Sequence, residues 1–415
     1  MMALLQIEEP RPSRAPAPQW RAFLELGFRP LYIAGCSWAL VSILLWVFMP
    51  QWLTGRLAGV AWHAHEMLWG FIATIAAGFL LTAGANWTGL NPLHGRPLGW
   101  LALLWLVARL AFLVPGQTAF VVAALADLLF FGWSAAAMGR AIVVKRNRRN
   151  YGVPLLMLGL GVADGLFLWA VGIGDPALLM QRFHAGLLCM AVIALLVARR
   201  IIPFFAMRAV TGLTIPMHTR SGHWQLGAGV LAIVFLLAGW RSAQAVALAA
   251  AGVLALWQLL AWKPWAVRHK PLLWVLYAGY AGLGAGLVVA AQAAVDPGVR
   301  AAWPVHVIAV AGFSVLIIGM VTRTALGHLG RPLQTDRSMV TAYLLVIVAA
   351  VLRLLALVPG SLMLGLLHAS ALAWTLAFGL YLWRFLPMLI RPRIDAQPSM
   401  AVKPGKIVMP TRPAS

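Results

Sequence analysis

Two histidines and a glutamate open one long apolar run, the segment "WHAHEMLWGF" at Trp62–Phe71. These are His63, His65 and Glu66, and Met67 follows at once. Neutral imidazole is the commonest ligand of transition metals, and thioether sulfur suits Cu(I). A carboxylate beside such ligands can orient them or carry a proton. Because polar groups are costly in an apolar run, these side chains predict a functional site.

The spacing of the two histidines separates them on a helix. At 3.6 residues per turn, residues two apart point about 200° apart. His63 and His65 can therefore serve two centres, one on each face of the helix. Glu66 shares the face of His63 and can orient that ring through a hydrogen bond. If the helix begins only after Trp62, the turn is irregular and the two rings can converge on one ion.

Two further histidines stand near the starts of other apolar runs. The interval from His65 to His184 is similar to the interval from His184 to His306. We expect the three imidazoles to lie at one depth, near the outer face of a membrane, as ligands of a haem or of a metal such as copper, iron or zinc. His63 is then the expected ligand of a second centre.

The chain that carries these residues is too apolar for a soluble protein. Of its 415 residues, 62% are hydrophobic and 10% are charged. Apolar runs of about 20 residues recur, and a run of that length crosses a bilayer as an α-helix. We therefore predict an all-α polytopic membrane protein with roughly twelve spans. The predicted spans are 30–49, 62–85, 97–115, 118–140, 153–173, 177–198, 224–240, 243–262, 271–294, 302–324, 338–358 and 361–387.

Several spans resemble one another. The sequence "GRPL" occurs at Gly95–Leu98 and at Gly330–Leu333, and the spans that follow end as "RLAFLVPG" and "RLLALVPG". The preceding spans open as "AWHAH" and "AWPVH". A third, weaker copy of this pattern around His184 indicates three units of four helices each. Because each unit has an even number of spans, all units begin on the same side of the membrane and the repeats are parallel. The predicted membrane domain, 30–387, thus comprises repeats 30–150, 151–268 and 269–387, between tails 1–29 and 388–415.

The net charge of +22 follows the predicted topology. Basic residues gather in the two tails and in every second connection. By the positive-inside rule that side and both termini are cytoplasmic. The predicted partner of the basic side is the lipid bilayer, and this placement excludes nucleic acid. The opposite side and its helix ends hold six basic residues: Arg56, Arg109, Arg182, Arg241, Arg300 and Arg353.

Charged residues within spans are costly and so are candidates for function. Asp127 and Asp164 can pair with an arginine or relay protons. Three arginines near the outer face can snorkel to headgroups or hold the carboxylates of a haem. They are Arg109, Arg182 and Arg353.

A second basic group lies at the predicted cytoplasmic ends of two spans. Cations there suit the dipole at a helix C-terminus and anionic lipid. The alternative is a separate cytoplasmic-side site. The residues are Arg199, Arg200, Arg323 and His328.

In six segments the chain resembles the NnrS family. The resemblance implies an inner-membrane protein that contains haem and copper and is linked to nitric oxide metabolism and nitrosative stress. It does not imply a reaction. Carried over residue by residue, it points to His63, His65, Glu66, His184, His306 and His328. The segments are "GFRPLYIAG" (Gly27–Gly35), "WHAHEMLWGF", "GFLLTAGANWTG" (Gly78–Gly89), "RFHAGLL" (Arg182–Leu188), "RRIIPFF" (Arg199–Phe205) and "RTALGHLGRPL" (Arg323–Leu333).

The predicted architecture is also similar to subunit one of the haem–copper oxidases. That subunit has twelve helices in three four-helix arcs, with its metal histidines near the outer face. Here the HxH pair stands on the second span rather than the tenth, and the seventh span lacks a histidine pair. The similarity therefore implies a scaffold and not oxygen reduction.

Three functional classes follow. The leading one is a haem- and copper-binding membrane protein that protects against, senses or processes nitric oxide, with an electron donor of unknown identity. The second is a secondary transporter with twelve helices. The third is a sensor or chaperone that bears a cofactor without turnover, so whether the protein is an enzyme stays open.

Overall fold

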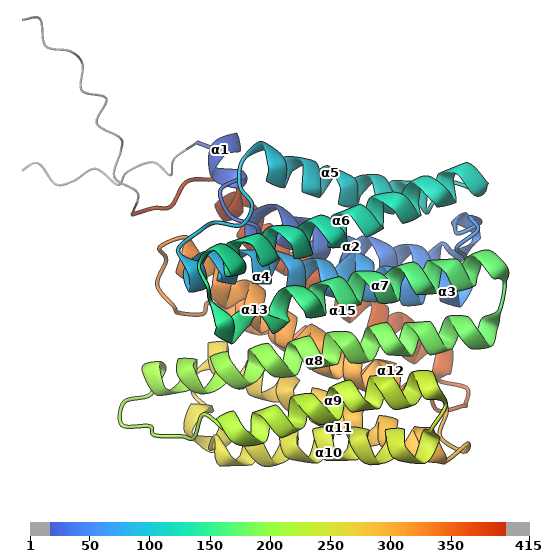
Figure 1. Cartoon of the computed structure of the whole chain (residues 1–415). Coiled ribbons are helices and arrows are strands. Elements are labelled where there is room, and N and C mark those ends of the chain that lie inside the picture. The colour runs from blue at the N-terminus through green and yellow to red at the C-terminus, as the bar shows by residue number, and fades with distance from the viewer. Residues whose placement is uncertain (1–16, 396–415) are drawn as a thin grey trace, which may run out of the picture.

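The chain folds into a single bundle of long helices that lie side by side (Figure 1). The computed structural model describes residues 17–395, and this part of the chain contains helices and turns without a strand. Eleven helical segments within it are long and apolar enough to cross a membrane. The one predicted span that is not among these eleven, 97–115, corresponds to the 16-residue helix α5 (Arg96–Ala111). This helix packs against α6 (Gln117–Val144). The predicted all-α polytopic membrane fold is confirmed.

Most long helices that follow one another in the chain are neighbours in the bundle, and α4, which packs against α2 and α6 rather than α5, is the exception. The first and last long helices also pack together, so the order closes on itself. The first half comprises α1 (Trp20–Phe23), α2 (Phe28–Phe48), η1 (Pro50–Trp52), α3 (Gly59–His65), η2 (Glu66–Ala73), α4 (Thr74–Thr88), α5, α6, η3 (Arg148–Asn150) and α7 (Gly152–Ile173).

The second half of the chain begins with the longest helix, α8, and ends beside α2. Both described ends of the chain lie at the same end of the bundle in Figure 1, where the Gln19 amide donates to the Ile390 carbonyl at 2.9 Å. The elements are α8 (Pro176–Ala209), α9 (Thr219–Ala238), α10 (Arg241–Ala261), η4 (Pro264–Val267), α11 (Pro271–Val295), α12 (Ala302–His306), η5 (Val307–Ser314), α13 (Val315–His328), α14 (Arg337–Leu355) and α15 (Met363–Leu389).

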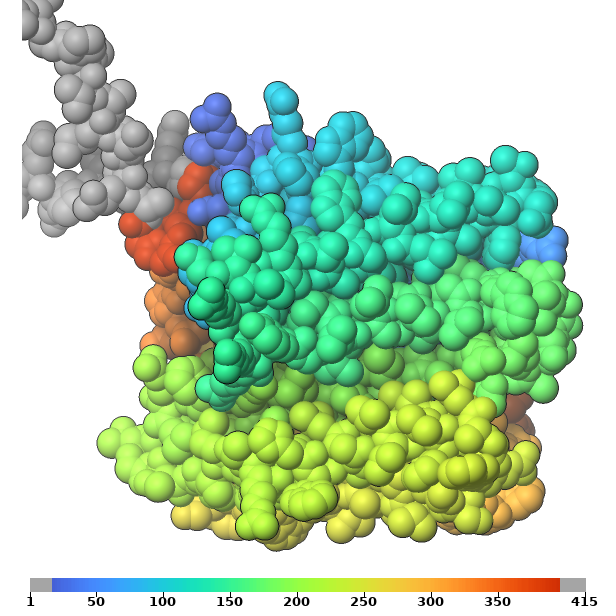
Figure 2. All heavy atoms as spheres, viewed as in Figure 1, coloured from blue at the N-terminus to red at the C-terminus, as the bar shows by residue number. Residues whose placement is uncertain are grey.

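Apolar side chains cover the outer wall of the bundle. Figure 2 shows α6 to α10 forming one side of this wall. On α9 and α10, Leu231, Val253 and Leu260 expose 49%, 57% and 60% of their surface. A continuous exposed apolar wall is unfavourable in water and suits lipid, where helices satisfy their own backbone groups.

Two matching spans contain a π-helical segment at the same place. In α3–η2–α4 the π-helix begins directly after His65, and in α12–η5–α13 it begins directly after His306. A π-helix shifts the backbone bonds to i→i+5 and is frequent at functional sites. Hydroxyls donate to carbonyls inside both segments, from Thr74 to Trp69 at 2.9 Å and from Ser314 to Ala309 at 2.8 Å. The threefold repeat itself stays a prediction.

The helix that contains the sixth predicted span, 177–198, extends beyond that span. This helix, α8, continues to Ala209, through Arg199, Arg200 and an internal Pro203. An apolar run ends where charges begin, but a helix needs no apolar residues beyond the hydrocarbon core. Proline removes one backbone donor there without ending the helix.

The predicted cytoplasmic tails, 1–29 and 388–415, are described only in part, because residues 1–16 and 396–415 lie outside the described residues. The described portions are joined by buried Arg29. Its guanidinium donates to the Leu389 carbonyl at 3.1 Å and to the Arg391 carbonyl at 2.6 Å. These bonds fix the two ends of the membrane domain to each other.

Asp336 caps α14, and its contribution to stability is expected to depend on pH. Burial alone would raise its pKa, but hydrogen bonds from Ser338, the Met339 amide and Arg384 lower that pKa below its ordinary value. A lowered folded-state pKa means that the stabilisation is present above the unfolded pKa, near 4, and is lost as pH falls through the folded pKa. We expect Asp336→Ala to lower the free energy of unfolding by about 1 kcal/mol at neutral pH.

The difference between Asp336→Ala and wild type should shrink when thermal unfolding in detergent is repeated below about pH 4. Asp336→Asn is the control, because its amide oxygen can still cap the helix while losing the charge. A difference that stays constant with pH would contradict this account.

Candidate functional site

The helix α3 presents its two histidines to different surroundings. It is regular from Gly59 through His65, so residues two apart face away from each other. His63 points to a cavity shared with His306, and His65 enters a buried group of charged side chains. One short helix therefore contributes to two sites.

The first site is an apolar cavity of about 310 Å³ between α2, α3, α8 and α12. The rings of His63 and His306 have centroids 6.5 Å apart and planes inclined at 21°. The indole of Trp46 stacks on His63 with a centroid distance of 5.0 Å. Met67 and Arg353 also line the cavity. Two imidazoles, a thioether and a cation thus share one apolar space.

The imidazole nitrogens of this cavity are free to bind a metal. His306 Nδ1 lies 2.7 Å from the Ala302 carbonyl, which can only accept, so Nδ1 carries the proton and Nε2 keeps its lone pair in the neutral ring. His63 Nδ1 is buried and has no hydrogen-bond partner among the described residues. The two rings, whose centroids lie 6.5 Å apart, could together hold one metal ion.

The predicted histidine trio is not brought together. His306 has His63 as its neighbour instead of His65, and His184 does not line their cavity. The reason lies in the register of α8, which presents Met180, Phe183 and Leu187 to the cavity, an i, i+3, i+7 set on one face. His184 falls beside that face, with its ring 5.6 Å from that of Phe183.

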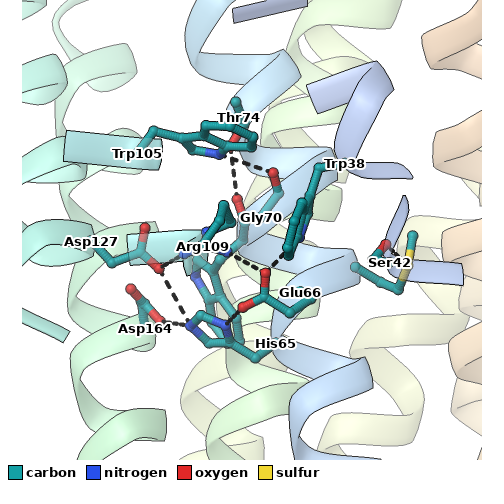
Figure 3. Close-up of polar contacts among 12 residues, drawn as sticks. Trp38, Ser42, His65, Glu66, Gly70, Thr74, Trp105, Arg109, Asp127 and Asp164 are labelled. Atoms are coloured by element: carbon teal, nitrogen blue, oxygen red, sulfur yellow. Dashed lines mark hydrogen bonds and ion pairs between the residues drawn. The ribbon is translucent and has the colours of Figure 1, made fainter. Parts of the chain in front are cut away.

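The second site is a buried charge cluster around His65 (Figure 3). His65 Nδ1 lies 2.8 Å from Glu66 Oε1, and Nε2 lies 2.9 Å from Asp164 Oδ1. Asp127 Oδ2 is 3.5 Å from the same Nε2. All four side chains are fully buried. Both ring nitrogens face carboxyl groups, so when these are ionised each nitrogen donates and the imidazole holds two protons.

Arg109 joins the two halves of the charge cluster. It donates to Glu66 Oε2 at 2.9 Å and to Asp127 Oδ2, and its guanidinium is fully buried. The Trp38 indole donates to the same Glu66 oxygen at 2.5 Å. Gly70 makes this packing possible, because a Cβ there would lie 2.4 Å from Arg109 Nη1.

Two expectations about these residues were wrong. Glu66 orients His65 and not His63, because its carboxylate turns toward Arg109 and Trp38. Arg109 does not face the cavity of His63, since Glu66 and Asp127 occupy its guanidinium. Arg182 does not line that cavity either, and Arg353 does.

The charge cluster can hold a proton or a metal ion. Three negative and two positive side chains leave one negative charge when His65 is doubly protonated. His65, Asp127 and Asp164 offer ligand atoms that all lie within 4.8 Å of one another, so a cation could replace the proton on Nε2. The charge cluster lies on the face of α3 that is opposite to His63.

Some contributors to both sites carried no recognisable signal in the sequence. Trp46 and Trp38 stand in an ordinary apolar run, and their roles depend on which helices meet. Gly70 could have been noticed only as a small residue near a charged one. The residues of the predicted cytoplasmic-side group line two adjoining cavities at the end of the bundle that holds both described ends of the chain: Arg199, Arg200, Arg323 and His328.

The model of the family described as NnrS protein matches residues 22–393, which span both sites and nearly the whole chain. No curated protein matches the sequence.

Proposed function

Because the chain belongs to the NnrS family, we propose that it is a haem- and copper-binding protein of the bacterial inner membrane that acts in the response to nitric oxide. The observation that carries this proposal is the pairing of His63 with His306 in an apolar cavity beside Met67. Imidazole suits both iron and copper, and thioether sulfur favours Cu(I). We further propose, from the positive-inside rule, that the basic end of the bundle faces the cytoplasm.

Each side chain has a role in this proposal. His63 and His306 are the metal ligands, and Met67 is a soft third ligand. Arg353 is the partner for an anionic substituent such as a haem carboxylate. A metal bound there would supply a coordination position for a diatomic ligand such as nitric oxide. The apolar walls admit an uncharged gas and exclude water, while Trp46 holds the His63 ring in place.

The charge cluster is the proposed proton site that accompanies the metal cavity. His65 holds its protons between Glu66 and Asp164, and the backbone of α3 connects it to His63 two residues away. A buried proton store beside a metal cavity supports chemistry that consumes protons, and also a sensor whose charge changes when its ligand binds.

Metal and haem content of purified variants tests the assignment. In cofactor-replete cells, we expect wild type to carry copper and a haem band in the dithionite-reduced minus oxidised spectrum. His63→Ala and His306→Ala should each weaken metal binding at least about tenfold, because a ligand is lost. His269→Ala, at an exposed position, is the control.

The assignment fails if the two variants keep wild-type spectra and copper content, or if His184→Ala removes them instead. Absence of both haem and copper from the wild-type protein would contradict the proposed function itself. Stopped-flow measurement of nitric oxide consumption with an added reductant then separates turnover from sensing, because a sensor binds the gas once and stops.

A further inference from the structure

Two adjoining cavities lie at the end of the bundle that carries both chain ends. The larger has a volume of about 690 Å³ and is bordered by α4, α8 and α13. The smaller, of about 450 Å³, is bordered by α8 and the start of α9. Arg149 and Arg200 line both, so the two form one continuous basic region. Neither cavity belongs to the metal cavity or to the charge cluster.

This basic region contains cations without acids. Arg149, Arg200 and Arg323 line the larger cavity, and Arg199 joins in the smaller one. Among the described residues, no aspartate or glutamate lines either cavity. The three membrane-buried acids are all committed to the charge cluster around His65.

Two of these arginines are buried without a protein acceptor. Arg323 exposes 8% of its surface and Arg199 exposes 5%. Within the part of the chain that is described, neither side chain donates a hydrogen bond or forms an ion pair, and Arg199 Nε is buried without a partner. The guanidinium of Arg323 lies 3.8 Å from the centre of the Phe205 ring, which holds it in place. A buried cation is costly unless an anion satisfies it.

The walls of the larger cavity define what kind of anion would fit. Beside the arginines it is lined by Phe79, Trp87 and Phe204, together with the amide side chains of Asn86 and Asn147. Its volume lies in the range of about 300–1,000 Å³ that holds organic ligands, and far exceeds one inorganic ion. Guanidinium groups bind phosphate oxygens in bidentate fashion.

We infer that this basic region binds a phosphate ester, with the phosphate on Arg200 and Arg323 and an organic body against the aromatic wall. An anionic phospholipid and a soluble phosphate ester share this chemistry. Arg200 is already held for the task, since it donates to Asn150 Oδ1 at 2.7 Å. The inference does not depend on metal binding.

Thermal unfolding of the full chain in detergent, with added ligand, tests the site. The probes are phosphatidylglycerol, adenosine diphosphate and, as a zwitterionic comparison, phosphatidylcholine. A ligand that binds the folded state raises the melting temperature. We expect one of the first two to do so in wild type and in Arg96→Gln, an exposed arginine at the same end of the bundle. In Arg200→Gln/Arg323→Gln the affinity should fall about ten- to a hundredfold.

The response identifies the source of the phosphate. A shift with phosphatidylglycerol alone assigns the site to lipid, and a shift with adenosine diphosphate alone assigns it to a soluble ester. Equal shifts in wild type and the double variant, or no shift with either probe, would overturn the proposal. Without ligand, the double variant loses the hydrogen bond from Arg200 to Asn150 but is relieved of the buried charge of Arg323, so each ligand-induced shift is measured from that protein's own ligand-free melting temperature. A double variant that melts lower than wild type without ligand and still shows the full wild-type shift would mean that the arginines serve structure only.

Discussion

Replacing Arg109 by leucine is expected to destabilise the protein by about 3–5 kcal/mol, because it leaves two buried carboxylates without their cation. The guanidinium bridges Glu66 and Asp127, and all three side chains are fully buried. Its removal also weakens the hold on His65, whose partners Glu66 and Asp164 would then repel each other more strongly. Chemical or thermal unfolding in detergent measures the change.

Three comparisons separate the charge effect from the loss of packing. Arg109→Lys keeps the charge but cannot bridge two carboxylates, so an intermediate loss is expected. Arg109→Leu combined with Glu66→Gln and Asp127→Asn removes the uncompensated charges and should recover much of the stability. Arg182→Leu is the matched control, since this arginine is only half-buried and has no ion pair among the described residues. Equal stability of Arg109→Leu and Arg182→Leu would contradict the account.

The arrangement of the two sites has a structural cause in α3. The helix is short, regular and followed at once by a π-helix, in which the carbonyl of Gly70 accepts from the Trp105 indole at 3.1 Å. The indole satisfies a carbonyl in the π segment, so the segment is stable without water. The same span therefore supplies a metal ligand from one face and the core of a charge cluster from the other.

The spans were predictable because a bilayer imposes both length and composition on them. All twelve predicted runs correspond to helices, and the main error, at the end of α8, arose where charge begins outside the hydrocarbon. The separation of His63 from His65 was predictable too, since it follows from the helical angle alone.

The partners of these residues were not predictable from local sequence. His63 meets His306 because α3 and α12 approach each other across the bundle, a contact between segments far apart in the chain. His184 recurs at the right interval, yet the register of α8 turns it away by one position. Helical spacing alone does not predict that Glu66 contacts His65 rather than His63. The ion pair with Arg109, from another helix, orients the Glu66 carboxylate toward His65.

A second large effect is expected from Gly282→Ala, at the contact between α11 and the π-helix η5. A Cβ at Gly282 would lie 2.3 Å from the Ala311 carbonyl oxygen, and this backbone atom cannot rotate away as a side chain does. Gly286 also faces η5, near the amide of Ile308, and Gly279 faces the start of α13, near the amide of Leu316. The substitution therefore has to push η5 away from α11, with an expected loss of about 3 kcal/mol, the upper end for overpacking.

Gly132→Ala in α6 is the matched control, because a Cβ there meets nothing within 4 Å. Both substitutions add the same helix propensity, about 1 kcal/mol in favour of alanine, so only the available space differs. Gly132→Ala should be neutral or slightly stabilising in thermal unfolding. If the two variants melt alike, the tight contact at Gly282 is not real.

Gly282→Ala also tests whether the packing of η5 positions the proposed metal site. The π-helix η5 begins directly after His306, so a displacement of η5 moves that ring relative to His63. Copper content should consequently fall in Gly282→Ala and stay at the wild-type level in Gly132→Ala. A destabilised Gly282→Ala that retains full copper would mean that His306 is positioned by the Ala302 carbonyl and α12 alone, independently of the π segment.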